Sequence, residues 1–340
     1  MRTSVLTKKN VSVLTILVGL IVTVFLVSLN TGTFKIPPMD VLKSLVGLGA
    51  EDQSVILFEF RMPRMVIAIL VGSALAMSGA ILQGLSRNPL ADPGIIGINA
   101  GAGLTVVIFV YFFFGKVGTG TFLSVFILPF FALVGAILAA VIIYLLAWKD
   151  GVSSTRLILV GIAVAAGFGA VSVSLIFSMK MTSNDFRFAT IWLAGSLWGT
   201  DWKFVLSVLP WMVIFMPLAI SKAHILNVMN LGDSTAVGLG VNVEKERRKL
   251  LFIAVCLAGA SVAVAGGIGF IGLMAPHLAR RLVGGKHQIM LPTAALIGTF
   301  LLLFADVISR SVLTTSEIPV GLVISVIGAP YFIYLLMRTK

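Results

Sequence analysis

The sequence predicts an all-α integral membrane protein with about ten transmembrane helices, forming one transmembrane domain over residues 1–340. The 340 residues are 59% hydrophobic and only 11% charged, with a mean hydropathy of +1.09, whereas soluble domains carry about 25% charged residues. Apolar residues also form long runs without Asp, Glu, Lys or Arg, such as residues 117–148 and 250–279. Such continuous runs exclude a membrane β-barrel, in which apolar and polar residues alternate.

The charge-free runs divide into ten predicted spans, because a helix needs roughly 20 apolar residues to cross a bilayer. The eighth segment is short and rich in glycine. The first follows basic residues, as in a signal peptide, but it is long and no small-residue cleavage site follows, so we expect it to be retained. The predicted spans are residues 11–30, 63–83, 95–114, 122–147, 157–179, 203–220, 250–266, 268–283, 290–309 and 318–337.

The positions of Lys and Arg predict that both termini are cytoplasmic. With ten spans and a cytoplasmic N-terminus, 16 of the 25 basic residues fall in inner segments, as expected where cytoplasmic loops carry the excess of positive charge. The net charge of +12 is explained mostly by this bias. We therefore expect no nucleic-acid partner.

The sequence lacks the patterns of an enzyme. It has no GxxxxGK[ST] phosphate-binding loop and no HExxH pair. The single cysteine, Cys256, lies within the seventh predicted span and is expected to be a small buried hydrophobe. Asp306 is the best candidate for an ion-coupling carboxylate, but it lies near the outer end of its span, and Arg310 one turn later could form an ion pair with it. We expect no catalytic residues, metal site or cofactor, and a separate subunit as the energy source.

Residues 221–249 form the longest polar stretch and are predicted to be a cytoplasmic loop. The motif "LGDSTAVGLG" predicts a short helix flanked by glycines and followed by a basic run. Such a helix could present Leu231, Ala236 and Leu239 to a partner. The alternative is a solvated basic loop that only fixes the topology.

Two other motifs have competing interpretations. In "RMPR", Arg61 and Arg64 are three residues apart and share a helix face, where they could bind a partner or extend towards lipid headgroups. The segments "ALAMSGAILQGLSRNPLA" (74–91) and "VAVAGGIGFIGLMAPHLA" (262–279) align as an inverted repeat, a feature of transporters. Chance similarity between two Ala/Gly-rich segments is the alternative.

A series of long motifs resembles the membrane permease subunits of type II ABC importers, which take up iron–siderophore complexes, haem and cobalamin. The resemblance extends from about residue 59 to 336. It is carried, in this order, by "RMPR", "GSALAMSGAILQGLSRNPLADPGIIGINAGAG", "LGDSTAVGLGVNV", "GFIGLMAPHLARRL", "LPTAALIGTFLLLFADVISR" and "EIPVGLVISVIGAPYFIYLL".

The resemblance implies a machine with several partners. A second permease subunit, identical or related, completes the pathway. Two copies of a cytoplasmic ATPase use ATP, and an extracytoplasmic binding protein or lipoprotein delivers the chelate. The implied location is the cell membrane of a prokaryote. A ferric siderophore is the expected cargo; cobalamin or haem are alternatives, and an ion-coupled secondary transporter is a distant one.

The resemblance also implies roles for particular residues. Arg61, Arg64 and Arg310 correspond to arginines that dock the binding protein. In the cytoplasmic gate, Asn88 and Leu90 of "RNPLADP" are expected to act with Ser154 and Thr155 of "SSTR". The residues expected to couple to the ATPase are Leu231, Gly232, Ala236, Leu239, Gly240 and Val241.

Overall fold

The computed structural model describes residues 7–32, 36–94, 97–113, 122–148, 154–178, 189–312 and 317–338. Throughout these ranges the regular elements are helices. Their bounds are α1 Lys8–Asn30, α2 Pro38–Leu45, α3 Glu51–Val55, the π-helix η1 Ile56–Arg61, α4 Met62–Ser86, α5 Ile98–Phe113, α6 Phe122–Ala147, α7 Ser154–Ser178, α9 Trp202–Ser221, α10 Ala223–Met229, α11 Asp233–Gly238, α12 Val243–Ala265, α13 Ile271–Val283, α14 His287–Ser311 and α15 Val320–Arg338.

Each of the ten predicted spans overlaps one helix. Among the described residues, seven helices are long and apolar enough to cross a membrane, and α5 and α15 are shorter apolar helices. The 13 residues of α13 extend about 20 Å at 1.5 Å per residue, less than the roughly 30 Å hydrocarbon core. This helix is therefore too short to cross the membrane alone. It begins at Ile271, three residues after the start of the eighth predicted span.

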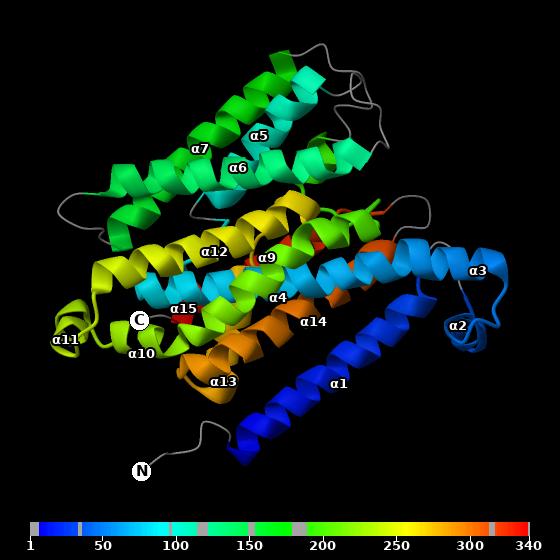
Figure 1. The fold of residues 1–340 in the computed structure, drawn as a ribbon, viewed down its shortest axis with the longest axis horizontal. Coiled ribbons are helices and arrows are strands. Elements are labelled where there is room, and N and C mark those ends of the chain that lie inside the picture. The colour runs from blue at the N-terminus through cyan, green and yellow to red at the C-terminus, as the bar shows by residue number, and fades with distance from the viewer. Residues whose placement is uncertain are drawn as a thin grey trace.

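The bundle is built around α4 and α12, with α14 beside α4. In the apolar segments of Glu51–Ser86, which includes α4, and of α12, 78% of the residues are buried. The corresponding shares are 11% in α1 and 17% in α7. Figure 1 accordingly shows α1 and α7 at opposite edges of the molecule. Gly72 of α4 and Gly298 of α14 face each other so closely that a methyl group on either would overlap the other's backbone. Small residues at this crossing let the two backbones pack directly.

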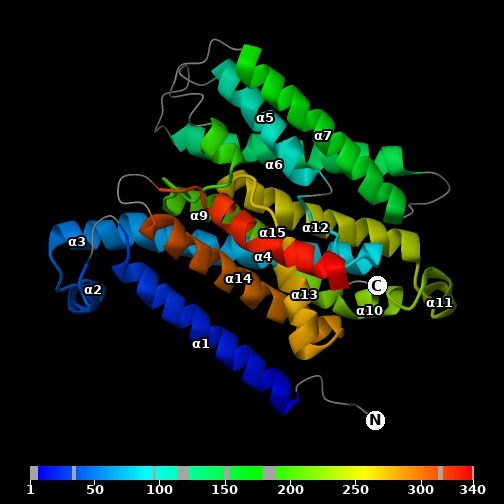
Figure 2. The same cartoon turned by 180° about the vertical axis from the view of Figure 1, so that it is seen from behind.

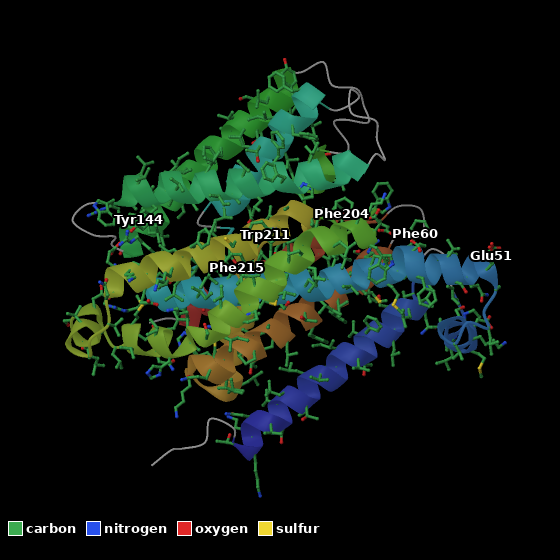
Figure 3. The ribbon with its side chains drawn as sticks, in the orientation of Figure 1. Glu51, Phe60, Tyr144, Phe204, Trp211 and Phe215 are labelled. Atoms are coloured by element: carbon green, nitrogen blue, oxygen red, sulfur yellow. The ribbon has the colours of Figure 1, made fainter. Side chains whose placement is uncertain are left out.

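The two ends of the bundle differ. The start of α1 and the end of α15 lie on the side that carries α10 and α11, while α2 and α3 lie at the opposite end (Figures 1 and 2). We call these the α11 end and the α3 end. Figure 3 places Glu51 at the tip of the α3 end and Tyr144 close to the α11 end. The Tyr144 hydroxyl donates to Glu244 Oε1 at 2.6 Å and so joins α6 to α12.

The helix containing α4 is longer than its predicted span. Glu51–Ser86 forms 36 continuous helical residues, so Arg61 and Arg64 lie within a helix and not at its beginning. The π-helix η1 ends at Arg61, two residues before Pro63. Proline lacks the N–H that an α-helix interior requires, and π-helical turns are rare and occur mostly as single turns inside α-helices, often at functional sites.

A break in the helical backbone separates α12 from α13. It begins at Gly266, with φ of +69°, where a side chain would overlap the Trp192 carbonyl oxygen, and it ends at Phe270, with φ of +65°. Gly79, which the repeat aligns with Gly266, lies inside α4. The two segments therefore differ in conformation at a matched glycine, although they pack together through Gly79 and Gly272.

Candidate functional site

At the α3 end, three arginines and two carboxylates form what we call the arginine cluster: Arg61, Arg64, Arg310, Asp306 and Glu317. Arg64 Nε donates to Asp306 Oδ1 at 2.7 Å, and Arg64 Nη1 donates to Glu317 Oε2 at 2.6 Å. Arg310 Nη2 lies 2.9 Å from Asp306 Oδ2, an ion-pair distance without hydrogen-bond geometry. The arginines are each at most 9% exposed, and Asp306 is fully buried. The predicted Asp306–Arg310 pair is thus present as part of a larger network.

Two of these arginines also cap the end of α1. Arg310 Nη1 donates to the Thr31 carbonyl at 3.1 Å, and Arg61 donates to the Leu29 carbonyl. Carbonyls in the last turn of a helix have no intrahelical donor and carry the negative end of the helix dipole. These guanidinium groups therefore contact protein atoms, as structural caps do, and are not directed at lipid headgroups.

At the α11 end, the predicted coupling loop consists of α10, α11 and the first turns of α12. Gly232 and Gly240, with φ of +115° and +83°, flank α11, and the Val241 amide donates to the Ala236 carbonyl at 3.0 Å. Leu231, Val237 and Leu239 are each more than 60% exposed. The expectation that Ala236 is presented to a partner is wrong: Ala236 is fully buried, because its side of the helix faces the bundle.

The loop that follows α4, residues 87–93, is stabilised by its own hydrogen bonds. Arg87 adopts a left-handed conformation, with φ of +51°, and ends α4. Asn88 Oδ1 accepts from the Leu90 amide at 2.9 Å, which is an Asx-turn. Leu90 packs against a cluster formed by Leu273, Met274 and Leu335. Asn88 and Leu90 are therefore together in one ordered turn.

The second predicted gate element is only partly described. Thr155 is exposed in the first turn of α7, and α7 begins at the α11 end (Figure 1). Ser154 begins α7, but its side chain lies outside the described residues.

A cavity of about 420 Å³ is lined by the end of the 87–93 loop, by the break at residues 266–270, and by residues of α5, α13 and α15. Its lining includes Asp92, Asn99, Trp192, Phe270 and Ser325. Irregular backbone at membrane depth occurs only where it is buried in protein or lines a cavity. The glycines and prolines of residues 87–93 and 266–270 indicated irregular backbone in the sequence, but nothing indicated that the two segments line the same cavity.

One contact joins the 87–93 loop to α11. Asp233, the first residue of α11, accepts from Arg87 through Oδ1 and from Arg247 through Oδ2, the latter at 2.8 Å. Burial acts to raise the pKa of Asp233, but the hydrogen bond and charge of Arg247, and then those of Arg87, outweigh it and lower the pKa below its usual value. Nothing in the residue spacing indicated this contact, because Arg87 and Asp233 are 146 residues apart.

A multi-pass helical bundle with broken helices, a cavity between the breaks and an apolar surface at one end defines a membrane transport protein. Comparison with known proteins identifies the group. Residues 20–338 match the model of the FecCD transport family. The chain belongs to the FecCD transport family.

Individual relatives cover most of the chain. It is 54% identical over 334 residues to the iron(3+)-hydroxamate import system permease protein FhuG of Bacillus subtilis, covering 98% of this chain and 99% of that protein. It is 39% identical over 289 residues to the cobalamin import system permease protein BtuC of Halobacterium salinarum, covering 84% of this chain and 74% of that protein. Among solved structures, a metal-chelate type ABC transporter in an inward-facing conformation matches with a TM-score of 0.83 at 29% identity, covering 96% of this chain and 99% of that one.

Proposed function

We propose that this chain is the permease subunit of an ATP-driven importer that carries an iron(3+)-hydroxamate complex into the cytoplasm. The observation that carries the proposal is the 54% identity, over almost the whole of both chains, to an iron(3+)-hydroxamate import permease. The lower identity to a cobalamin permease makes cobalamin the second candidate. Haem, the other alternative cargo, has no such relative among those compared above.

The proposed assembly contains two permease subunits, two copies of a cytoplasmic ATPase and an extracytoplasmic binding lipoprotein, in the cell membrane of a prokaryote. ATP is used by the ATPase, and this chain is not an enzyme. The test is uptake of an iron(3+)-hydroxamate complex into vesicles that contain the purified assembly. Uptake that requires ATP on the side of the membrane that carries the ATPase supports the proposal. Uptake driven by an ion gradient in vesicles without the ATPase contradicts it.

We propose that α11 and its flanking turns dock on the ATPase. The support is the exposed apolar group Leu231, Val237 and Leu239, which lies on and beside a helix flanked by two glycines with positive φ. Water would otherwise cover this surface. Leu239→Glu should raise ATP hydrolysis per transported complex while the protein level in the membrane stays normal. Gly240→Ala should act similarly but more weakly, because alanine is strained at a φ of +83°. Unchanged coupling in both variants would exclude the docking role.

We propose that Asn88 and Leu90, with Ser154 and Thr155 of the other element, form the gate on the cytoplasmic side. The support is the ordered Asx-turn at Asn88 and the exposure of Thr155 at the same end of the bundle. Cysteines introduced by Asn88→Cys in both permease copies should crosslink to an extent that changes with the nucleotide state. Crosslinking that is absent, or equal in every state, would contradict the gate.

We propose that Arg61, Arg64 and Arg310 dock the binding lipoprotein, with Arg64 as the principal contact. The support is the partial exposure of its partner, since the Glu317 side chain is 27% exposed. A carboxylate of the binding protein would take the place of Glu317, because a guanidinium can grip a carboxylate through two N–H groups. Glu317→Gln should therefore strengthen binding at low salt. Weaker or unchanged binding would contradict the docking role and mean that the arginine cluster only stabilises the fold.

A further inference from the structure

Asp233 lies where three elements of the α11 end meet. It begins α11, while Arg87 ends α4 and Arg247 lies in the second turn of α12. The end of α4, the start of α12 and α11 lie together in both views (Figures 1 and 2). Its two carboxylate oxygens each bind a different arginine. We call this arrangement the Asp233 bridge.

One side of the bridge is continuous with the 87–93 loop. Besides binding Asp233, Arg87 donates Nε to the carbonyl of Met229, the last residue of α10, at 3.2 Å. Arg87 is thus attached to both helices of the α10–α11 segment. The next residue, Asn88, fixes the position of Leu90 through its Asx-turn, and Ala91 N donates to the Asn88 carbonyl at 3.2 Å. Arg87 is therefore followed directly by a hydrogen-bonded turn that holds Leu90.

The other side of the bridge is anchored in the bundle. The Arg247 side chain is 12% exposed, and its Nη1 lies 3.7 Å from Glu244 on the same helix. Farther along α12, the Ala254 carbonyl accepts from the Ser78 hydroxyl of α4 at 2.7 Å. The Arg247 side thus belongs to the packed centre of the protein, whereas α11 projects from it.

We propose that Asp233 is a positioning residue that transmits movement of α11 to the 87–93 loop through Arg87, so that ATPase movements open and close the cytoplasmic side of the pathway. This inference rests on the proposed function, in which α11 contacts the ATPase and the loop forms part of the gate. It requires Asp233 for coupling and not for attachment of the ATPase, since the side chain binds Arg87 and Arg247 of its own chain.

The structure offers a matched control. Glu246 of α12 also bridges two cations, Lys222 at 2.7 Å and Lys249 at 2.9 Å. It connects the end of α9 to α12, and these contacts do not involve the 87–93 loop. Glu246→Gln therefore removes a bridging carboxylate at the same end of the protein without cutting the path from α11 to Leu90.

The experiment uses the assembled importer with its ATPase and binding protein in vesicles, and an iron(3+)-hydroxamate complex as the probe. It measures ATP hydrolysed per complex transported, together with the amount of ATPase that copurifies. Asp233→Asn and Arg87→Gln should each raise the ratio about fivefold, the low end of coupling effects between sites. Asp233→Glu should restore most of the coupling, and Glu246→Gln should leave the ratio unchanged.

A second readout separates transmission from general loosening. In a Leu90→Cys background, which keeps the Asx-turn of Asn88, crosslinking between the two permease copies should lose its dependence on nucleotide state when Asp233→Asn is added, while ATP hydrolysis continues. The inference is overturned if Asp233→Asn keeps the wild-type ratio, if Glu246→Gln raises it equally, or if Asp233→Asn mainly releases the ATPase. Failure of the proposed function is distinguishable, because then the wild-type assembly itself would show no ATP-dependent uptake.

Discussion

Asp306→Asn should destabilise the permease strongly, because it removes the carboxylate shared by Arg64 and Arg310. The arginine cluster contains three arginines and two carboxylates, so the substitution leaves one compensating charge for three buried cations. Two charges about 4 Å apart interact by roughly 4 kcal/mol at an effective dielectric constant of 20. Measured losses when one partner of a buried pair is removed are about 3–5 kcal/mol. We expect a loss of that size here, since the Asp306 side chain is fully buried and those of Arg64 and Arg310 are at most 10% exposed.

The assay is the apparent melting temperature of the detergent-solubilised permease, followed by the loss of its monodisperse peak in size-exclusion chromatography. At about 2 °C per kcal/mol for a large chain, the melting temperature should fall by about 6–10 °C. Asp40→Asn is the control, because its pair with Lys43 spans 3.5 Å on the surface and should contribute at most about 1 kcal/mol. If Asp306→Asn and Asp40→Asn have the same melting temperature, the cluster does not stabilise the fold and the reasoning fails.

Three further outcomes are expected. Gly79→Ala should prevent normal packing of α4 on α13, since its methyl group would overlap the Gly272 carbonyl. Gly167→Ala should be neutral, because the space around Gly167 is open. The amounts of the two variants in the membrane test this difference. Ser78→Ala should cost about 0.6–2 kcal/mol in melting experiments by removing the interhelical hydrogen bond to the Ala254 carbonyl, and a neutral result would mean that this bond is replaced in the variant. Because the pKa of Asp233 is lowered in the folded protein, its ion pairs are complete above the usual aspartate pKa and are lost only as pH falls through the lower folded value. The difference in coupling ratio between wild type and Asp233→Asn should thus be constant from about pH 5.5 to 8, and a difference that shrinks near pH 6 would contradict this.

The sequence predicted the long helices well, because the cost of placing charges in lipid makes charge-free runs a direct record of the spans. The ends were less accurate wherever helices continue into polar sequence. The 36-residue helix Glu51–Ser86 begins twelve residues before the predicted span at residue 63, since Glu51, Asp52 and Arg61 interrupt its apolar pattern without interrupting its backbone. The break at residues 266–270 could be suspected from its glycines, but not that Phe270 takes up a positive φ there.

The candidate site was predicted only where its contacts are local. The Asp306–Arg310 pair follows from a spacing of four residues, but Arg64 reaches the same carboxylate from 242 residues away. Such a contact depends on how α4 packs against α14, and no periodicity within either helix determines that. The error at Ala236 has a related cause: a helix of six residues is too short for its apolar pattern to define one buried face.

The two charged networks differ in a way that suits opposite roles. In the arginine cluster the central carboxylate is fully buried, whereas the side chains of Asp233 and Arg87 are 49% and 42% exposed. Breaking a buried network leaves unpaired charge in an apolar environment, so the contacts of Asp306 with Arg64 and Arg310 should persist throughout transport. An exposed ion pair is worth only about 1 kcal/mol, so the Asp233 bridge can lose and regain its contacts within a cycle at little cost. Because its ion pairs are weak, the Asp233 bridge should have only the modest effect on coupling expected above. The contacts that can change during transport therefore lie at the end of the protein where α11 and the 87–93 loop meet.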